Sequence, residues 1–329
     1  MAIATRNSTL WADLETTYGS GTPALTLDDG ILVINPTFTP QFEMLEPEER
    51  PGTSGQHASH LGRYWSQLAF DTLLRSSGTA HAKTTEPKLG RLLQACGFTM
   101  SSGGTDPSGY YRYSLSSTLS THKSLFAEAY FGDSIAGIKH SIKGLRGTFN
   151  FSFDSGQLPV CSFMYKGIRI AATSTPLPAS TFETTQPMTA LSVAIAGLPV
   201  ASATINLLHF EFDLGREPVM GEDAQDVTGV TEFYSTNWNI KGNIVVEALP
   251  GLTVALETEL LARTGKTLIV TCDQPDDADE HCTFKFVNAK WENYEYGDKD
   301  GIRTITIPFT AFESSGDDSL VIQFGAVLA

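Results

Sequence analysis

The chain has 329 residues, of which 41% are hydrophobic and 18% charged, and its net charge is −15. Such an acidic surface repels phosphate, which argues against a protein that wraps or reads nucleic acid, although not against one that lets it pass. Abundant Thr, Ser, Gly and aromatic residues indicate a mainly β protein, and the length favours about two domains.

Nothing in the sequence predicts export or a membrane span. The start, Met1–Thr17, has no apolar core of a secretory signal, and the longest uncharged run, Thr184–Leu208, is interrupted by prolines and a glycine. The cysteines show no tight spacing and are expected to be reduced thiols made in a cytosol: Cys96, Cys161, Cys272 and Cys282.

The N-terminal residues 1–30 are expected to form an arm. Leu10, Trp11 and Leu14 fit one amphipathic turn, and Tyr18–Pro23 then breaks any regular element. Ile31–Ile34 follows as a short buried strand candidate.

Thr37–Arg63 shows no hydrophobic period and is rich in proline, glycine and acid. A stretch of this kind predicts a functional or assembly loop. The acidic cluster Glu43–Glu49, followed by Arg50, is compatible either with a solvated loop or with docking on a neighbouring subunit through carboxylate–arginine contacts.

The strongest pattern is a hairpin, Gly147–Gly167. Phe149, Phe151 and Phe153 alternate with polar residues, a turn at Asp154–Gln157 follows, and the return is rich in β-forming residues. A similar hairpin, Lys290–Phe312, carries Trp291, Tyr294 and Tyr296 before a Gly-Asp turn, then Ile305, Ile307 and Phe309.

Helices at Pro87–Gly97 and Pro250–Gly265 precede the two hairpins, and both contain a Leu pair and end at Gly. The repeated order suggests a duplication. We therefore expect an arm (1–30), a first β domain (31–170), a linker (171–187), a second β domain (188–313) and a C-terminal segment (314–329).

No motif supports catalysis, a cofactor or a metal. Gly265-Lys266-Thr267 ends a helix instead of opening one, so it does not fit a phosphate-binding loop. The run Cys272–Cys282 holds two thiols and five carboxylates but follows no zinc or calcium spacing, and is expected as a solvated hairpin loop. His57 and His60 are expected as solvent or interface residues.

Short motifs, in order along the whole chain, resemble tail tube (major tail) proteins of long-tailed, siphovirus-like bacteriophages. These motifs are Glu15-Thr16-Thr17-Tyr18-Gly19, Asp29-Gly30-Ile31-Leu32-Val33, Glu49-Arg50-Pro51, Leu92-Leu93-Gln94-Ala95-Cys96-Gly97-Phe98, Arg146-Gly147-Thr148-Phe149 and Gly316-Asp317-Asp318-Ser319-Leu320-Val321-Ile322. The extended Thr37–Arg63 segment departs from the pattern.

The resemblance implies two tandem β-sandwich or partial-barrel domains, each with one flanking helix. It implies a non-enzymatic virion protein, assembled in the host cytoplasm, whose stacked rings conduct tape-measure protein and DNA and meet tail terminator and distal tail proteins. Three two-domain copies, rather than six, would give a ring with pseudo-six-fold symmetry.

Within that expectation, the two hairpins form the barrel wall, and some of the excess acid faces the channel. The arm, the long loop and the C-terminal segment are expected to join adjacent rings. Contacts between subunits or rings are assigned to Trp11, Glu46, Glu49, Arg50, Arg216 and Glu217.

Two alternatives remain open from the sequence. One is a monomeric β-sandwich that binds carbohydrate or another ligand on aromatic platforms such as Trp238 and Trp291. The other is a tube protein of a contractile injection device.

Overall fold

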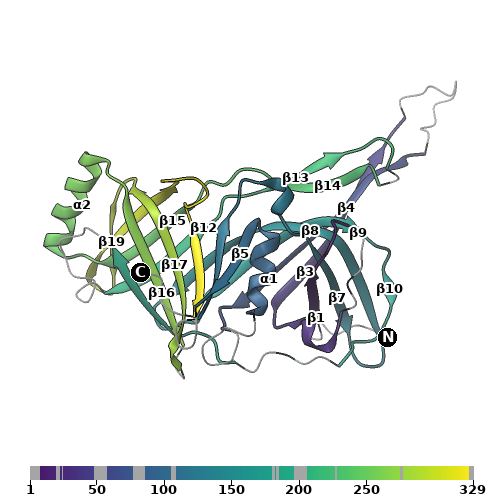
Figure 1. The fold of residues 1–329 in the computed structure, drawn as a ribbon, viewed down its shortest axis with the longest axis horizontal. Helices are drawn as coiled ribbons and strands as arrows, with labels where there is room; N and C mark the ends of the chain where they lie inside the picture. The colour runs from purple at the N-terminus through teal and green to yellow at the C-terminus, as the bar shows by residue number, and fades with distance from the viewer. Residues whose placement is uncertain are drawn as a thin grey trace.

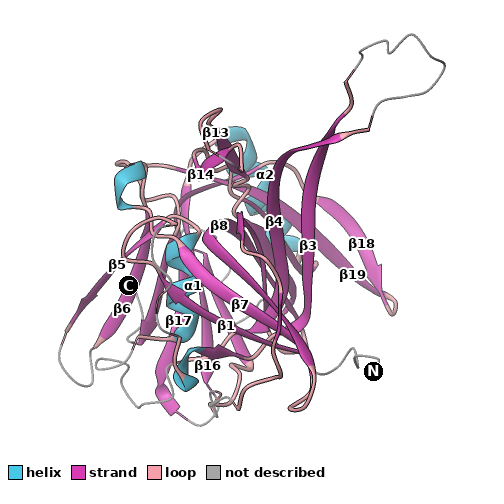
Figure 2. Ribbon diagram, turned by 90° about the vertical axis from the view of Figure 1, so that its right-hand side faces the viewer, coloured by secondary structure: helices cyan, strands magenta, loops and turns pink. Residues whose placement is uncertain are grey.

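The computed structural model describes residues 8–19, 23, 25–47, 58–76, 86–104, 109–179, 182, 185–195, 206–226, 228–274 and 277–325. Strands dominate these residues, the sheets are antiparallel, and they do not close into a barrel. The protein is therefore mainly β, with two α-helices in the described residues, as the composition indicates (Figures 1 and 2).

The first half contains one α-helix and two 3-10 turns among its strands. Its elements are β1 (Ser8–Leu14), η1 (Leu27–Asp29), β2 (Gly30–Ile31), β3 (Ile34–Leu45), β4 (His60–Leu73), α1 (Lys88–Ala95), β5 (Phe98–Gly103), β6 (Tyr110–Leu115), η2 (Leu119–Thr121), β7 (Leu125–Gly132), β8 (Gly137–Asp154), β9 (Val160–Arg169) and β10 (Thr173–Ser174).

The second half has the other α-helix. Its elements are β11 (Ala190–Ile195), β12 (Leu207–Asp213), β13 (Pro218–Glu222), β14 (Val230–Ser235), β15 (Lys241–Glu247), α2 (Pro250–Ala262), β16 (Lys266–Gln274), β17 (Asp277–Trp291), β18 (Glu295–Lys299), β19 (Ile302–Phe312) and β20 (Val321–Gly325).

The long strand β8 joins the two halves in one sheet. One edge of β8 pairs with β9. On the other edge, residues 137–145 pair with β7, whereas residues 150–154 pair with β12 of the second half. The hairpin predicted from the alternating phenylalanines is thus present, and its first strand also joins the two halves of the chain.

The same order of strand pairing occurs in both halves. In the first half the sheet runs β3-β4-β9-β8, and in the second it runs β12-β15-β19-β18. A helix follows the second strand of each series, α1 after β4 and α2 after β15. The repeated order supports the duplication inferred from the sequence, and the domain boundaries stay a proposal.

A second junction is made by the C-terminal segment. β20 pairs with β17 on one side and with β6 of the first half on the other. Ile322 and Phe324 are buried in the shared core. The expectation that residues 314–329 join adjacent rings does not fit residues 321–325, because these complete the sheet of their own chain; residues 326–329 lie outside the described part.

The N-terminal expectation of a helical turn in a separate arm is wrong for residues 8–14. They form β1, which pairs with β7 along its length and with β2 at Leu10 and Trp11. Both faces of this strand are covered at its centre, because Leu10 and Ala12 pack in the core on one face and Trp11 is buried on the other.

The long loop expected at Thr37–Arg63 is instead mostly a hairpin. β3 reaches Leu45 and β4 starts at His60, so the connection is confined to residues 46–59, most of which (48–57) lie outside the described residues. Pro40 hid the strand pattern, but proline is tolerated on an edge strand, where its missing N–H needs no partner.

The helix ends follow local chemistry only in part. α1 begins after Pro87, and Gly97, with φ of 86°, turns the chain beyond its C-terminus as predicted. α2 ends earlier than expected, with Arg263 in the left-handed conformation (φ 53°) in place of Gly265.

Candidate functional site

Several edges of the sheet are free in the described residues, including those of β5 and β11, and two of them belong to the repeated series. β3 pairs only with β4, and β18 pairs only with β19. β3 is the first strand of the first series and β18 is the last strand of the second, so the two strands stand at opposite ends of the repeated series. An open edge presents unpaired backbone N–H and C=O groups that can extend the sheet with another chain.

Large apolar side chains are exposed beside both edges. Ile34 on β3 has an exposed fraction of 41%, and Tyr296 on β18 and Ile302 beside it have 50% and 53%. Exposed apolar surface along an open edge is unfavourable in an isolated chain, so both edges have the character of contact surfaces.

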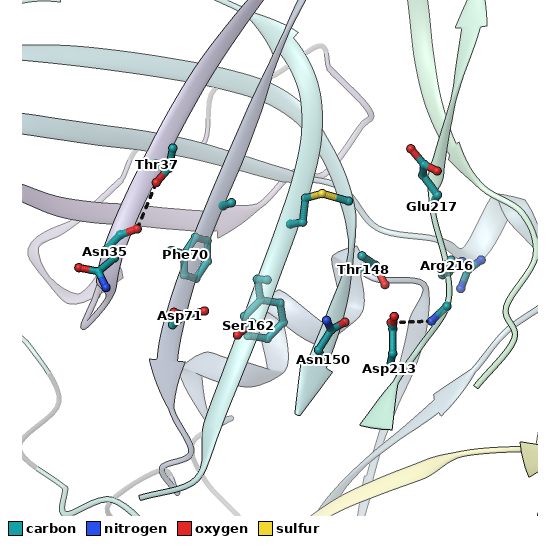
Figure 3. A pocket seen from close by; sticks show the side chains of 14 residues that line it. Asn35, Thr37, Phe70, Asp71, Thr148, Asn150, Ser162, Asp213, Arg216 and Glu217 are labelled. Carbon is teal, nitrogen blue, oxygen red and sulfur yellow. Dashed lines mark hydrogen bonds between the residues drawn. The ribbon is translucent and has the colours of Figure 1, made fainter. Parts of the chain in front are cut away.

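A broad polar face covers the side of the sheet away from the core. We use the name "polar face" for the outward residues of β4, β9, β8, β12, β15 and β19. Two open hollows of about 610 and 520 Å³ lie on it, and they share Asn150, Ser162 and Asp213 (Figure 3). Their openness to the surface does not match the enclosed apolar pocket typical of a small-molecule site.

Carboxylates prevail among the charged residues that line these hollows. Lys241 and Arg216 are the only basic residues in the described lining, and the Arg216 side chain is buried. The acidic residues are Asp71, Glu211, Asp213, Glu217 and Glu292.

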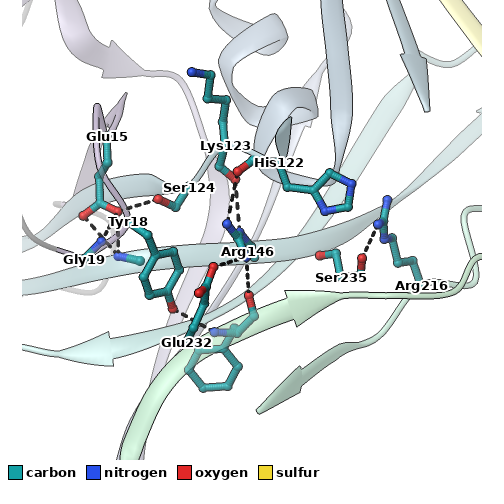
Figure 4. Close-up of polar contacts among 12 residues, drawn as sticks. Glu15, Tyr18, Gly19, His122, Lys123, Ser124, Arg146, Arg216, Glu232 and Ser235 are labelled. Carbon is teal, nitrogen blue, oxygen red and sulfur yellow. Dashed lines mark hydrogen bonds and ion pairs between the residues drawn. The ribbon is translucent and has the colours of Figure 1, made fainter. Parts of the chain in front are cut away.

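A buried polar cluster anchors the β13–β14 hairpin to the first half (Figure 4). Arg146 donates to the carbonyl oxygen of Phe233 at 2.9 Å and pairs with Glu232 at 2.6 Å. The Tyr18 hydroxyl accepts the N–H of Phe233 at 2.8 Å, and burial raises the pKa of Tyr18 well above its ordinary value. These contacts satisfy polar groups that burial would otherwise penalise.

Glu15 holds the turn that places Tyr18. Its carboxylate accepts the backbone N–H groups of Gly19 at 3.0 Å and of Gly144, together with the Ser124 hydroxyl at 2.6 Å. The motif Glu15–Gly19, which carried part of the resemblance, therefore has a structural role that spacing along the sequence did not reveal.

Arg216 fixes the other end of the hairpin. The side chain is 1% exposed, donates to the carbonyl oxygens of Cys96 (3.1 Å) and Ser235, and lies over the ring of Trp238. Burial lowers the pKa of Arg216 to about 10. The guanidinium is buried and bonded within its own chain, so Arg216 does not fit the expected contact between subunits.

The other residues assigned to contacts fall in different places. Trp11 is 6% exposed and packs near Tyr130 of its own chain, so it does not fit a contact between subunits either. Glu46 is exposed near the tip of the β3–β4 hairpin, and Glu217 is exposed and pairs with Lys166 at 2.7 Å. Glu49 and Arg50 lie outside the described residues.

Most of the residues expected in the barrel wall lie in the hydrophobic core. Phe149, Phe151 and Phe153 are buried, as are Ile305 and Ile307. The Tyr294 hydroxyl donates to Glu257 at 2.6 Å, and this bond raises the pKa of Tyr294 to about 12.

The two tryptophans do not form an open aromatic platform. Trp291 is 3% exposed and packs against Phe309, while Trp238 is half-buried beneath Arg216. These positions do not favour the carbohydrate-binding alternative.

The expected solvated loop at Cys272–Cys282 is corrected. Cys272 and Cys282 are opposite each other on β16 and β17, and both are fully buried, because both fall on the core side of the alternating strands. Across the residues that the structure describes, no group of three or more potential metal ligands is brought together, and no helix is long and apolar enough to cross a membrane.

The fold and these surfaces define an antiparallel β protein with open sheet edges at β3 and β18 and a broad polar face. The chain matches the family model described as "Phage tail tube protein" over residues 5–311, and it belongs to that family. A search of the curated proteins found no match.

Proposed function

We propose that this chain is a structural, non-enzymatic virion protein that polymerises into the stacked rings of a phage tail tube. Membership of the tail tube family supports a structural tail component. The observation that carries the finer proposal is the pairing of β8 with β12, because it shows how one repeated unit joins the next.

The internal junction provides a template for contact between chains. β8 is the last strand of the first series and β18 is the last strand of the second. β3 and β12 are the corresponding first strands. If copies join as the halves do, Glu295–Lys299 of one chain pairs with Asn35–Thr39 of the next. The contact is head to tail, and such contacts form a ring when the rotation closes.

Three copies close this ring in the proposal, with six repeated units around the circumference and pseudo-six-fold symmetry. Closure pairs the open edges of β3 and β18 and covers the apolar side chains beside them. Closure of the sheet is a general way in which β proteins avoid exposed edges.

The polar face then lines the channel. Its carboxylates repel DNA phosphates, and screening confines this effect to about 8 Å at physiological salt, enough to prevent adhesion of passing DNA. Tape-measure protein occupies the channel before ejection, tail terminator and distal tail proteins cap the tube, and assembly takes place in the host cytoplasm.

Thr39→Cys with Glu295→Cys tests the ring. These side chains are opposite each other in the proposed pairing, so mild oxidation should give covalent dimers and trimers on a denaturing gel, and neither single variant should give trimers. Negative-stain images should show rings of three chains. Six chains per ring would overturn the trimer, and a monomer at every concentration would overturn the proposed function.

A further inference from the structure

Two cysteines of the second half lie directly opposite each other on neighbouring strands. Cys272 of β16 is paired in register with Cys282 of β17, and both side chains are 0% exposed. All four cysteines of the chain are free thiols. The other two have no such partner, because Cys161 of β9 lies opposite no cysteine on β4 or β8, and Cys96 follows the end of α1. The chain therefore holds one pair of thiols in register.

Contacts on both sides of the pair fix this register. At the adjacent position, on the other face of the strands, Nδ1 of His281 lies 2.7 Å from Oδ1 of Asp273. β17 is also paired with β20, where Cys282 lies opposite Phe324, and β16 is paired with β11. A slip of one residue would turn a strand's side chains to the other face, so these neighbours keep the two sulfurs on the same side of the sheet.

The register places the two thiols within reach of a covalent bond. Residues directly opposite each other in an antiparallel pair have Cα atoms about 4.5 to 5.5 Å apart. A disulfide joins residues whose Cα atoms are roughly 4.4 to 6.8 Å apart. The two ranges agree, so a bond between Cys272 and Cys282 requires no movement of the backbone. Packing as small apolar side chains accounts for two buried cysteines, but it does not require that they face each other.

Burial decides which oxidant suits the pair. Neither thiol is exposed, and burial raises the pKa of both thiols well above the ordinary value, so the reactive thiolate is scarce in the folded chain. The two sulfurs therefore persist as thiols in a reducing cytosol and react slowly outside it. A small uncharged oxidant, hydrogen peroxide, suits this buried site better than a bulky disulfide.

We propose that Cys272 and Cys282 are an oxidisable pair, which hydrogen peroxide converts into a disulfide that locks β16 to β17. One sulfur attacks the peroxide, so that an S–O bond forms, the O–O bond breaks and water leaves. The other sulfur then attacks the sulfenic acid, so that the S–S bond forms and the oxygen leaves as a second water. The two sulfurs lose two electrons to the peroxide, and the two thiol protons end in the two waters.

Release of the virion provides the change of environment. A chain made in a reducing cytosol and then released passes into an oxidising environment, where a disulfide persists. The bond ties together the hairpin whose strands also hold β11, β19 and β20. This timing rests on the proposed function, whereas formation of the bond does not.

Treatment of the reduced, full-length chain with hydrogen peroxide tests the pair. The quenched protein is denatured, alkylated and cut with a protease that cleaves after glutamate, because Glu280 separates the two cysteines in the sequence. Peptides containing Cys272 and Cys282 should be joined until dithiothreitol separates them, with alkylation at Cys96 and Cys161 only. Alkylation of all four cysteines, or a bond to Cys161, would overturn the proposal.

Cys161→Ala is the matched control, because it removes another buried thiol and should leave the bond intact. In Cys272→Ala, Cys282 should be alkylated after peroxide treatment. A disulfide at Cys282 in that variant would show that the register does not select the partner. Should Cys272→Ala fail to fold, the peptide map of the wild-type chain still decides the proposal.

Hydrogen exchange tests the lock. Amides of β16 and β17 that exchange by local opening should exchange several-fold more slowly after peroxide treatment, and dithiothreitol should restore the original rates. Peroxide should not slow them in Cys272→Ala. Unchanged exchange in fully oxidised wild-type protein would overturn the lock. Failure of the wild-type chain to form rings would refute the proposed function instead, and would leave the peptide map unaffected.

Discussion

At the scale of single residues, the side chains between the first half and the β13–β14 hairpin include a buried histidine. His122 lies there, 5% exposed, with Nε2 at 2.7 Å from the carbonyl oxygen of Ser116. Burial lowers the pKa of His122, and the nearby Arg216 and Arg146 lower it further. The folded environment therefore favours the neutral form of the ring.

This environment predicts a pH dependence of stability. The folded pKa lies below the ordinary value of about 6.5, so the unfolded chain binds more protons and stability falls as pH drops from 6.5 toward the folded pKa. His122→Gln should reduce the decline in Tm between about pH 7 and 5. Part of the decline should remain, because burial also lowers the pKa of His140.

The exposed His60→Gln is the control and should leave the profile unchanged. An identical slope in wild type and His122→Gln would contradict the role of His122.

At the scale of elements, α1 shows how a helix end is tied to the hairpin. Gly97 adopts φ of 86°, and a Cβ there would lie 2.1 Å from Nη1 of Arg216. Gly156, in the β8–β9 turn, has φ of 81° but nothing within 4 Å of a Cβ. The two glycines thus share a left-handed backbone conformation, which would strain any other residue, and differ in surroundings.

Gly97→Ala and Gly156→Ala form a matched pair. Gly156→Ala should lower the free energy of unfolding by about 1–2 kcal/mol from backbone strain alone. Gly97→Ala should cost clearly more, because the guanidinium must move from its buried partners. Urea unfolding measures both, and equal losses would show that Arg216 adapts without cost.

The sequence predicts elements well where the pattern is local. The alternation Phe149–Phe153 and the Pro87 and Gly97 signals of α1 correctly predict a hairpin and a helix. Pairing between distant segments has no local signal, so the burial of Trp11 and the insertion of β20 were not predictable. Nor does spacing show that Arg216 is buried, because its partners, Cys96 and Ser235, come from different parts of the chain.

At the scale of the whole molecule, the two halves are repeated in pairing order but depend on each other. β8 passes from one to the other, and β20 pairs with β6 of the first half. The domain division expected from the sequence stays a proposal, and each half alone would expose strands that the other covers.

Residues 1–170 expressed alone should consequently aggregate, because the ends of β8 and the outer edge of β6 lose β12 and β20. Co-expression with residues 171–329 should restore soluble protein. Light scattering and near-ultraviolet circular dichroism distinguish these outcomes. A soluble, cooperatively folded fragment 1–170 would show instead that the halves are independent.

The position of β20 also determines how late during translation the sheet can be completed. β6 leaves the ribosome early, but its partner strand is translated only after nearly all of the remaining sequence, and pairing over so long a separation is slow. A nascent chain thus keeps an incomplete core until translation is almost finished. We expect chains truncated before β20 to lack this pairing and to leave the edge of β6 open.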